Sequence, residues 1–159
     1  MKVIVGRVMN GAGLASRTLA YAEARIAERT GLSPLVRGTL DLGLEGAHHF
    51  TADVIIPPKE GDGFGAQFLL LQACLVHGPH VVIGRKVRIP ACLLLPVLEP
   101  AAPYLVTRIA IVSNYHLRSI LRLMTGDRVG VEVDIDQEEW IRAIHSSGGL
   151  VEVGRAPGI

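Results

Sequence analysis

Two short segments of the sequence combine residue types that could bind a phosphorylated ligand and a divalent cation. The first is a glycine-bearing stretch, Gly11-Ala12-Gly13-Leu14-Ala15-Ser16, between an apolar segment and an expected helix. Glycines let the backbone approach a phosphate closely, and the free N–H groups at the start of a helix attract an anion. A plain turn between a strand and a helix is the alternative interpretation. The motif is weak as a dinucleotide-binding loop, because Ser16 stands where such a loop has its third glycine.

The second segment is Gly38-Thr39-Leu40-Asp41. Residues two apart on an extended strand point to the same side, so the Thr39 hydroxyl and the Asp41 carboxylate share a face. Oxygen ligands of this kind suit Mg²⁺, which takes few protein ligands and keeps positions for water and phosphate. A solvated strand face is the alternative interpretation.

A third cluster, Cys74-x-x-His77-x-x-His80, contains residue types that bind zinc. The sequence shows no fourth ligand, and a turn at Gly78-Pro79 beside a buried cysteine explains the spacing equally well. Cys74 and Cys92 do not make a disulfide framework, and no signal-peptide pattern opens the chain. We therefore expect a cytoplasmic, reducing location.

The composition predicts a folded domain. Of the 159 residues, 49% are hydrophobic and 19% are charged, which is too apolar for intrinsic disorder. The apolar runs are far shorter than the roughly 18 residues that a membrane-spanning helix needs, so we expect no membrane partner. A net charge of +1 argues against nucleic-acid binding through bulk charge. Such an apolar chain either fills its own core or buries a face in a homo-oligomer, and the sequence leaves both open.

Short apolar segments typical of strands alternate with a few helical ones. We expect strands at 2–9, 38–44, 52–56, 68–76, 81–83, 86–98, 105–112 and 128–133, and helices at 17–29, 114–123 and 136–144. The expected N-caps are Ser16, either Ser113 or Asn114, and Asp136 in a capping box with Glu139, while Gly31 is expected to end the first helix. The pattern predicts a mainly β fold, a closed six-stranded barrel with two or three short helices inserted. The barrel domain would span 1–134, and 135–159 would be a C-terminal helix and tail without being an independent domain.

Three segments, in order, resemble the archaeal CTP-dependent riboflavin kinase family over about residues 5–133. Residues 6–13 are similar to the opening strand and glycine loop of that family. Leu32-Ser33-Pro34 followed by Gly38-Thr39-Leu40-Asp41-Leu42 is similar to its GTLN signature, and residues 111–118 and 123–129 are similar to its last strand–helix–strand unit. The resemblance implies a cradle-loop barrel that transfers a phosphoryl group from CTP to a hydroxyl of riboflavin or a related acceptor.

The resemblance also implies roles for individual residues. The nucleotide would be held by Gly11, Ala12, Gly13, Leu14, Ala15 and Ser16, and by Tyr115, His116, Leu117 and Arg118. Thr39 and Asp41 would hold Mg²⁺, with Asp41 where the family usually has Asn. The family's two polar contacts to the flavin fall on Ala102 and Ala110 here, so the residues that bind the acceptor are not given, and no general base is identified.

Three functions follow as hypotheses. The first is a nucleotide- and Mg²⁺-dependent kinase that acts on a small hydroxyl acceptor. The second is a nucleotide- or flavin-binding module that does not transfer the phosphoryl group. The third is a DNA-binding barrel, since Leu117-Arg118 and Gly126-Asp127-Arg128-Val129 also resemble the AbrB-type transition-state regulators. The small net charge argues against the third.

Overall fold

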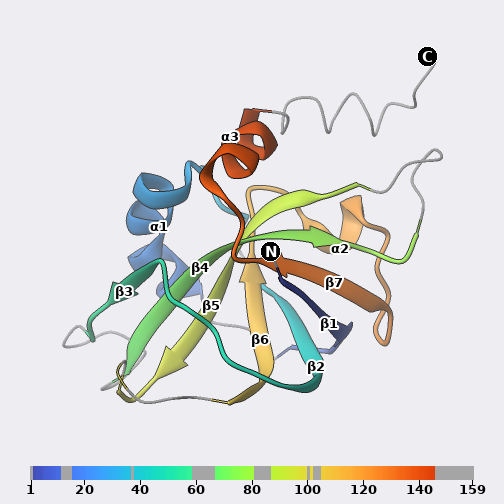
Figure 1. The fold of residues 1–159 in the computed structure, drawn as a ribbon, viewed down its shortest axis with the longest axis horizontal. Coiled ribbons are helices and arrows are strands. Elements are labelled where there is room, and N and C mark those ends of the chain that lie inside the picture. The colour runs from blue at the N-terminus through green and yellow to red at the C-terminus, as the bar shows by residue number, and fades with distance from the viewer. Residues whose placement is uncertain are drawn as a thin grey trace.

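The computed structural model describes residues 2–11, 16–36, 38–58, 67–80, 87–99, 101 and 105–145, without the side chains of 16–21. Figure 1 shows the elements in chain order. They are β1 (Lys2–Val8), α1 (Ser16–Thr30), β2 (Leu40–His48), β3 (Val54–Ile56), β4 (Phe68–His77), β5 (Ile89–Val97), β6 (Val106–Val112), α2 (Leu117–Ile120), β7 (Arg128–Val133) and α3 (Gln137–His145).

Six of these strands form a closed antiparallel barrel in the order β4-β5-β6-β2-β1-β7, and the pairing of β7 with β4 closes it. The edge of β4 is shared between two partners. Its first part pairs with β3 as far as Leu71, and its last part pairs with β7 from Leu75 onward. The edge of β4 between these residues therefore has a gap in its strand pairing, and this gap underlies one of the two cavities described below.

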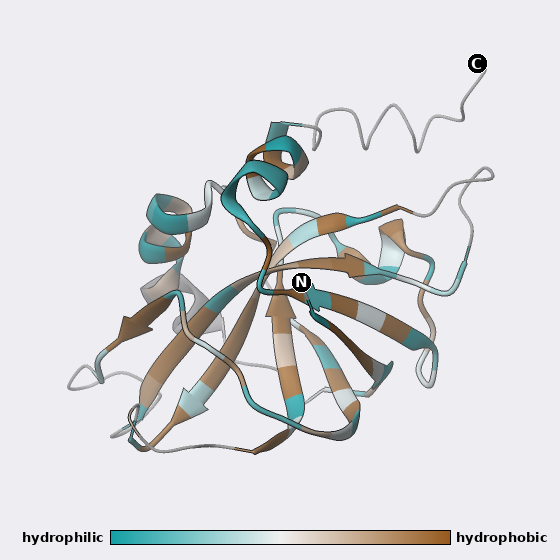
Figure 2. Cartoon of the chain, viewed as in Figure 1, coloured by the Kyte–Doolittle hydropathy of each residue, from teal (hydrophilic) through white to brown (hydrophobic). Residues whose placement is uncertain are grey.

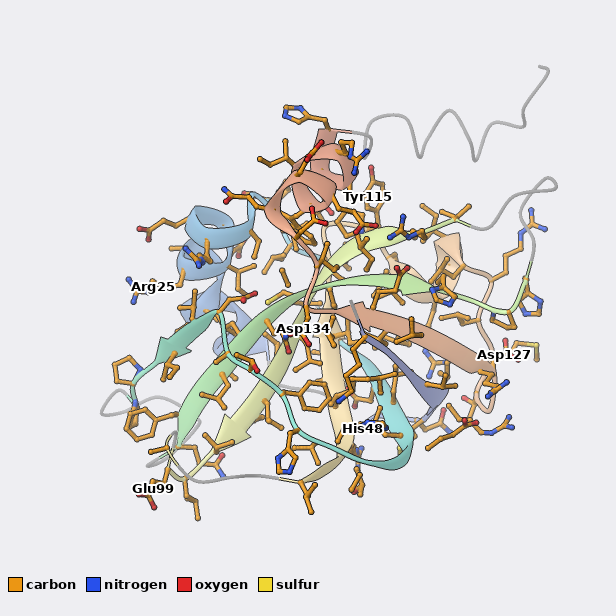
Figure 3. All side chains as sticks on the ribbon, viewed as in Figure 1. Arg25, His48, Glu99, Tyr115, Asp127 and Asp134 are labelled. Carbon is orange, nitrogen blue, oxygen red and sulfur yellow. The ribbon has the colours of Figure 1, made fainter. Side chains whose placement is uncertain are left out.

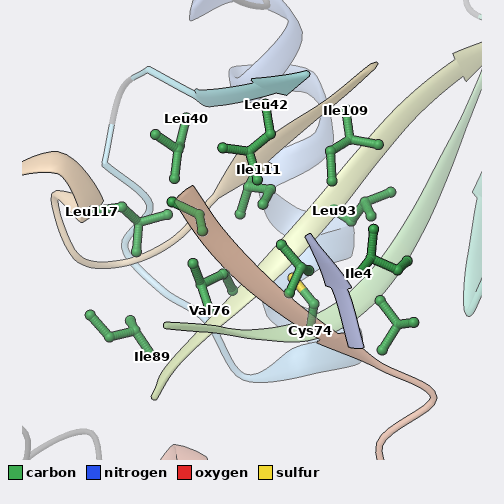
Figure 4. Packing of buried hydrophobic residues seen from close by; sticks show 14 of the residues in the cluster. Ile4, Leu40, Leu42, Cys74, Val76, Ile89, Leu93, Ile109, Ile111 and Leu117 are labelled. Carbon is green, nitrogen blue, oxygen red and sulfur yellow. The ribbon is translucent and has the colours of Figure 1, made fainter. Parts of the chain in front are cut away.

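The barrel interior is filled by aliphatic side chains, because alternate residues of each strand point inward. Figure 4 shows this packing, with Leu40 and Leu42 of β2 against Ile109 and Ile111 of β6. Ile4 of β1 is fully buried in the same cluster. The period-two pattern of Leu40, Leu42 and Leu44 therefore has the predicted meaning: these leucines face the core, and Thr39 and Asp41 face outward.

A second cluster covers the outside of β4, β5 and β6. It contains Ala22 and Ile26 of α1 together with outward residues such as Leu71, Cys92 and Leu94. Trp140 and Ile144 of α3 pack against this cluster, so α1 and α3 form one layer on the outside of the barrel (Figure 1). Figure 2 shows the corresponding contrast between apolar strands and helices with polar outer faces.

The predicted fold class, a closed six-stranded barrel with short helices, is confirmed, and most expected elements occur with shifted bounds. Gly31 ends α1 with a φ of 82°, a conformation that favours glycine. The expected strand at 52–56 is shorter, since β3 begins at Val54. The strand expected at 86–98 is also shorter, since β5 spans Ile89–Val97. The expected strand at 81–83, position 86, and the tail beyond His145 lie outside the described residues.

One expectation about a helix start is wrong, and another is confirmed only in part. The helix expected at 114–123 is only the four-residue α2, and its N-cap is His116 instead of Ser113 or Asn114. Ser113 is engaged elsewhere, because its Oγ donates to the Pro90 carbonyl and accepts from the Tyr115 N–H. The capping box before α3 is half formed.

In that half-formed box, the Glu139 N–H donates to Asp136 Oδ1 at 2.7 Å. The Glu139 carboxylate does not reach back to the start of the helix, because it accepts a hydrogen bond from Arg88. Both cysteines are free. Among the described residues, no helix has the length and apolar character needed to cross a membrane.

Candidate functional site

Asp41 is a buried carboxylate on the outward face of a barrel strand. It lies near the start of β2, and only 5% of its surface is exposed. Thr39 Oγ1 donates a hydrogen bond to Asp41 Oδ1 at 2.8 Å, so the two side chains share a face as their spacing predicts. Arg108 of the neighbouring strand β6 places Nη2 3.9 Å from Asp41 Oδ2. The guanidinium offsets part of the negative charge that Asp introduces where the resembling family has Asn.

The spacing of the Thr39 and Asp41 oxygens fits a magnesium ion. Adjacent ligands of an octahedral Mg²⁺ at its usual bond length lie roughly 2.9 Å apart. The Thr39 Oγ1 and Asp41 Oδ1 atoms are 2.8 Å apart, which is close to that separation and is also the ordinary length of the hydrogen bond they share. Two protein oxygens are also what Mg²⁺ commonly takes when phosphates and waters complete its shell. The described residues contain no group of three or more His, Cys, Asp or Glu side chains arranged to hold a metal, so protein ligands alone would leave this site incomplete.

The end of β1 lies directly against Asp41. The Met9 N–H donates to the Asp41 carbonyl at 2.9 Å, two residues before Gly11. The Arg118 guanidinium in α2 donates to the Met9 carbonyl at 2.9 Å. Asn10 Oδ1 accepts a hydrogen bond from Thr125 Oγ1 at 2.7 Å. The chain that leads into the glycine stretch is therefore fixed to both the Asp41 strand and the segment around α2.

A cavity of about 80 Å³ lies between the start of β2, the end of β6 and the segment of α2. It is lined by Val36, Gly38, Thr39, Leu40, Ile111, Ser113, Tyr115, His116, Leu117 and Arg118. Thr39 and the four residues 115–118, to which the resemblance assigns the metal and the nucleotide, therefore share one cavity, whereas Asp41 and Gly11 are not among its lining residues. Its volume suits a phosphoryl group or part of a sugar and is too small for a whole nucleotide.

The wall that α2 contributes is set by a local cap. His116 Nδ1 accepts from the Ser119 N–H at 3.4 Å and lies 2.9 Å from Ser119 Oγ. Leu117 is buried in the barrel cluster, which fixes the rotation of the short helix and leaves Arg118 free to turn toward Met9. Tyr115, labelled in Figure 3, is half-buried beside the same cluster.

The structure describes only some of the predicted site residues. Ala12, Gly13, Leu14, Ala15 and Ala102 lie outside the described residues; Gly11 is exposed, and the backbone of Ser16 begins α1. Ala110 pairs directly with Asp41 across β6 and β2. The position that resembles a flavin contact is therefore next to the proposed metal ligand, but its methyl side chain supplies no hydrogen bond.

The zinc alternative finds no support in the geometry, because its three residues have separate surroundings. Cys74 is buried in the barrel core, and burial raises the pKa of its thiol well above the ordinary value. His80 Nε2 lies 3.2 Å from Asp127 Oδ2, and His77 Nδ1 lies 3.6 Å from Glu132 Oε2.

Arg108 is the functional candidate that reasoning from the sequence missed. The signal was present in the alternation of β6, since Arg108 and Ala110 occupy outward positions that alternate with the buried Ile109 and Ile111. The alternation does not predict that β6 pairs with β2, nor the register of that pairing. It is this register that brings Arg108 close to Asp41.

The sequence matches no family model and no curated protein.

Proposed function

We propose that the protein is a nucleotide- and Mg²⁺-dependent phosphotransferase that acts on a hydroxyl of riboflavin or a related small molecule. The observation that carries the proposal is that Thr39 and residues 115–118 line one cavity, while the entry to the glycine stretch is hydrogen-bonded to Arg118 of that lining and to Asp41 beside it. Met9 makes both of these hydrogen bonds.

Phosphoryl transfer depends mainly on positioning and on neutralising charge, and the described residues supply groups for both. Arg118 uses one Nη atom to hold the Met9 carbonyl, which leaves other N–H groups of its guanidinium for a phosphate. Arg108 is half exposed and lies beside Asp41, where it can approach a phosphate oxygen. The two cations would hold a polyphosphate chain between the entry to the glycine stretch and β6.

Thr39 Oγ1 and Asp41 Oδ1 would hold the magnesium ion, which when bound supplies positive charge that neutralises developing negative charge on the phosphates. Asp41 keeps this pair oriented, because its backbone is fixed by Met9 and its carboxylate by Thr39. Arg108 lowers the affinity for the ion by its own charge, so we expect the metal to bind together with the nucleotide and only weakly alone.

A second candidate, a binding module without transfer, is favoured by one specific observation. Ala110 pairs with Asp41 at the place where an acceptor contact is expected, and its methyl group provides neither a hydrogen bond nor a base. A site that lacks polar contacts to its acceptor discriminates weakly, so nucleotide binding could persist without a productive acceptor complex.

The test combines ligand-dependent melting with product detection. CTP, ATP, GTP and UTP are added with and without Mg²⁺, and the melting temperature is recorded. A nucleotide at a hundredfold excess over its Kd stabilises the folded state by about 2.7 kcal/mol, or roughly 5–10 °C for a chain of this length. We expect such a shift for at least one nucleotide with Mg²⁺, and mass spectrometry of a reaction with riboflavin should find the phosphorylated product.

Variants at position 41 make the test specific. Asp41→Ala should remove the Mg²⁺-dependent part of the shift and lower the transfer rate by about 100-fold or more. Asp41→Asn keeps the shape and an oxygen ligand, so it should retain most of the shift, and Glu138→Gln on the exposed face of α3 should change nothing. A shift without product supports the binding module, and the absence of any shift at millimolar nucleotide rejects both candidates.

A further inference from the structure

A larger cavity, of about 400 Å³, lies between the barrel and the layer formed by α1 and α3. It opens at the gap in the edge of β4, where Gln72 and Ala73 pair with neither β3 nor β7. The C-terminal end of α1 contributes Arg29 and Thr30, and α3 contributes Trp140, Ile141, Ile144 and His145. Its size is that of a small-molecule site, and nothing in the proposed phosphotransferase uses it.

The polar groups at the β4 gap are mostly acceptors. Gln72 lines the cavity and is only 4% exposed, and its Nε2 donates to Asp134 Oδ1 at 3.1 Å. Gln72 Oε1 has no hydrogen-bond partner in the described part of the chain. Asp53 Oδ2 accepts from the Ala73 N–H at 2.7 Å, which uses one of its two oxygens. A buried amide oxygen without a donor costs free energy, so a ligand that donates hydrogen bonds would be stabilised here.

Asp134 is held in a conformation that few residues adopt. It follows β7 directly with a φ of 56°, in the left-handed region, and Figure 3 labels it at the start of the segment that leads to α3. Its carboxylate is fixed by Gln72 and lines the cavity. A strained residue whose side chain is held by a buried amide is typical of a position that serves a site.

The opposite wall is aromatic and aliphatic. The indole N–H of Trp140 donates to the Thr30 carbonyl at 3.0 Å, which fixes the plane of the ring and uses the only polar atom of this side chain. Ile141 and Ile144 extend the apolar surface. The last carbonyls of α1 carry the negative end of the helix dipole toward the same space. A fixed indole beside carboxylates is the environment that suits a cation with an apolar body.

We propose that this cavity binds an organic cation, an ammonium group carried on an aromatic or aliphatic body. The ammonium would lie at Asp134 and Asp53, and the body would lie against Trp140 and Ile144. Arg29 also lines the cavity, but it is exposed and can keep its guanidinium in water. The hydrogen bond from Gln72 engages Asp134 Oδ1, and the ammonium would bind at the other carboxylate oxygen, Oδ2.

The site is separate from the smaller cavity. Leu40 and Ile111, which line the smaller cavity, lie in one row of the barrel with Leu93 and Gln72. The nearest members of the two linings, Ile111 and Gln72, are two strand spacings apart along that row, or roughly 10 Å. Reacting atoms must approach to about 3.5 Å for transfer, so a ligand in the larger cavity is not the phosphoryl acceptor. Each proposal can therefore be tested, and rejected, without affecting the other.

The fluorescence of Trp140 provides the test, because it is the only tryptophan in the chain. Phenethylammonium is titrated against the full-length protein, and phenethyl alcohol and phenylacetate serve as neutral and anionic analogues of the same shape. We expect a saturable change in emission with phenethylammonium, and affinities at least about tenfold weaker for both analogues, because a hydrogen bond to a charged group is lost. Equal binding of the alcohol, stronger binding of phenylacetate, or no saturable change overturns the proposal.

Two variants localise the binding. Asp134→Asn keeps a residue that tolerates positive φ and keeps an oxygen for Gln72 Nε2, so the fold should survive while the charge is removed. Its affinity for phenethylammonium should fall about tenfold or more, whereas Glu138→Gln on the same helix layer should leave it unchanged. Unchanged affinity in Asp134→Asn rejects the site. Emission quenching by MgCl₂ alone that Asp134→Asn abolishes would assign the carboxylates to a metal and also overturn the proposal.

Discussion

The two cavities lie on the same barrel but are built in different ways. The smaller one is formed by the start of β2 and the end of β6 with the segment of the four-residue α2, and most of the polar contacts around it involve backbone groups or local turns. The larger one is formed where two helices cover a gap in the edge of β4. The first depends on strand register, and the second depends on how firmly the helices are attached.

Besides the packing of Trp140 and Ile144, one charged cluster attaches α3 to the barrel. Arg88, just before β5, donates from Nε to Glu132 Oε2 and from Nη2 to Glu132 Oε1, both at 2.8 Å. The same guanidinium also donates to Glu139 of α3. The Glu132 side chain is only 7% exposed, and these two carboxylates raise the pKa of Arg88. Arg88 therefore joins the barrel to the wall of the larger cavity and has no role in the smaller one.

The largest expected effect is the loss of stability on substituting Arg88, which contacts the wall of the larger cavity only. Arg88→Ala leaves the Glu132 carboxylate buried without its cation, so we expect a loss of about 3 kcal/mol in the free energy of unfolding. The matched control is Arg128→Ala, whose partner Glu45 is exposed and whose loss should cost less than about 1 kcal/mol. Urea unfolding measures both.

The same variant should change the helix layer more than the smaller cavity. Trp140 emission should shift to the red as α3 loosens, and the nucleotide-dependent rise in melting temperature should persist from a lower baseline. If Arg88→Ala abolishes the nucleotide shift in protein that is still folded, the two regions are coupled and the contrast drawn here is wrong.

A second, smaller effect concerns the two cysteines, which report on the two layers separately. Cys74 lies inside the barrel, whereas Cys92 lies in the outer cluster beneath the helices. Burial raises the pKa of Cys92 to about 12 and that of Cys74 well above its ordinary value, so neither is a reactive thiolate in the folded protein. Iodoacetamide labelling should therefore require opening, and Cys92 should be modified before Cys74 because its cover is the helix layer.

The raised thiol pKa values also predict how the stability of the protein changes at alkaline pH. The folded state holds the thiol protons more tightly than the unfolded state, whose thiols titrate near pH 8.5. Their contribution to stability is complete below that pH and is lost as the pH rises above about 8.5. Replacing both by Ser or Ala should flatten the decline measured by unfolding at pH 8 to 10, and modification of Cys74 ahead of Cys92 would contradict the order of opening.

Much of the barrel and part of the smaller site could be predicted from the sequence. Alternation identified β2, and with it the shared face of Thr39 and Asp41, because a period of two is a local property. It did not identify Arg108, whose nearness to Asp41 comes from the pairing of two strands more than sixty residues apart. The residues 115–118 were found only through the resemblance to a family, since a four-residue helix has no periodicity to detect.

The larger cavity has no local signal at all. Gln72 sits at an inward position of an otherwise apolar strand, Asp134 follows a strand end, and Trp140 lies on a short amphipathic helix. Each of these residues is ordinary in its own segment. They form a site only because β4 lacks a partner between β3 and β7 and because α3 returns to cover that gap, and both facts belong to the tertiary structure.

The smallest expected effect tests whether the smaller cavity is held locally. His116→Ala removes the side chain that caps α2, so we expect a loss of about 0.5–1 kcal/mol, and His116→Asn should restore most of it because Asn is a favourable N-cap. Since Ser119 is exposed and α2 has only four residues, the change should stay near 115–120 and leave Trp140 emission as in the parent protein. Hydrogen exchange of the amides in this segment gives the measurement. If His116→Ala costs as much as Arg88→Ala, the α2 segment is part of the global cooperative unit, and the smaller cavity is then no more local than the larger one.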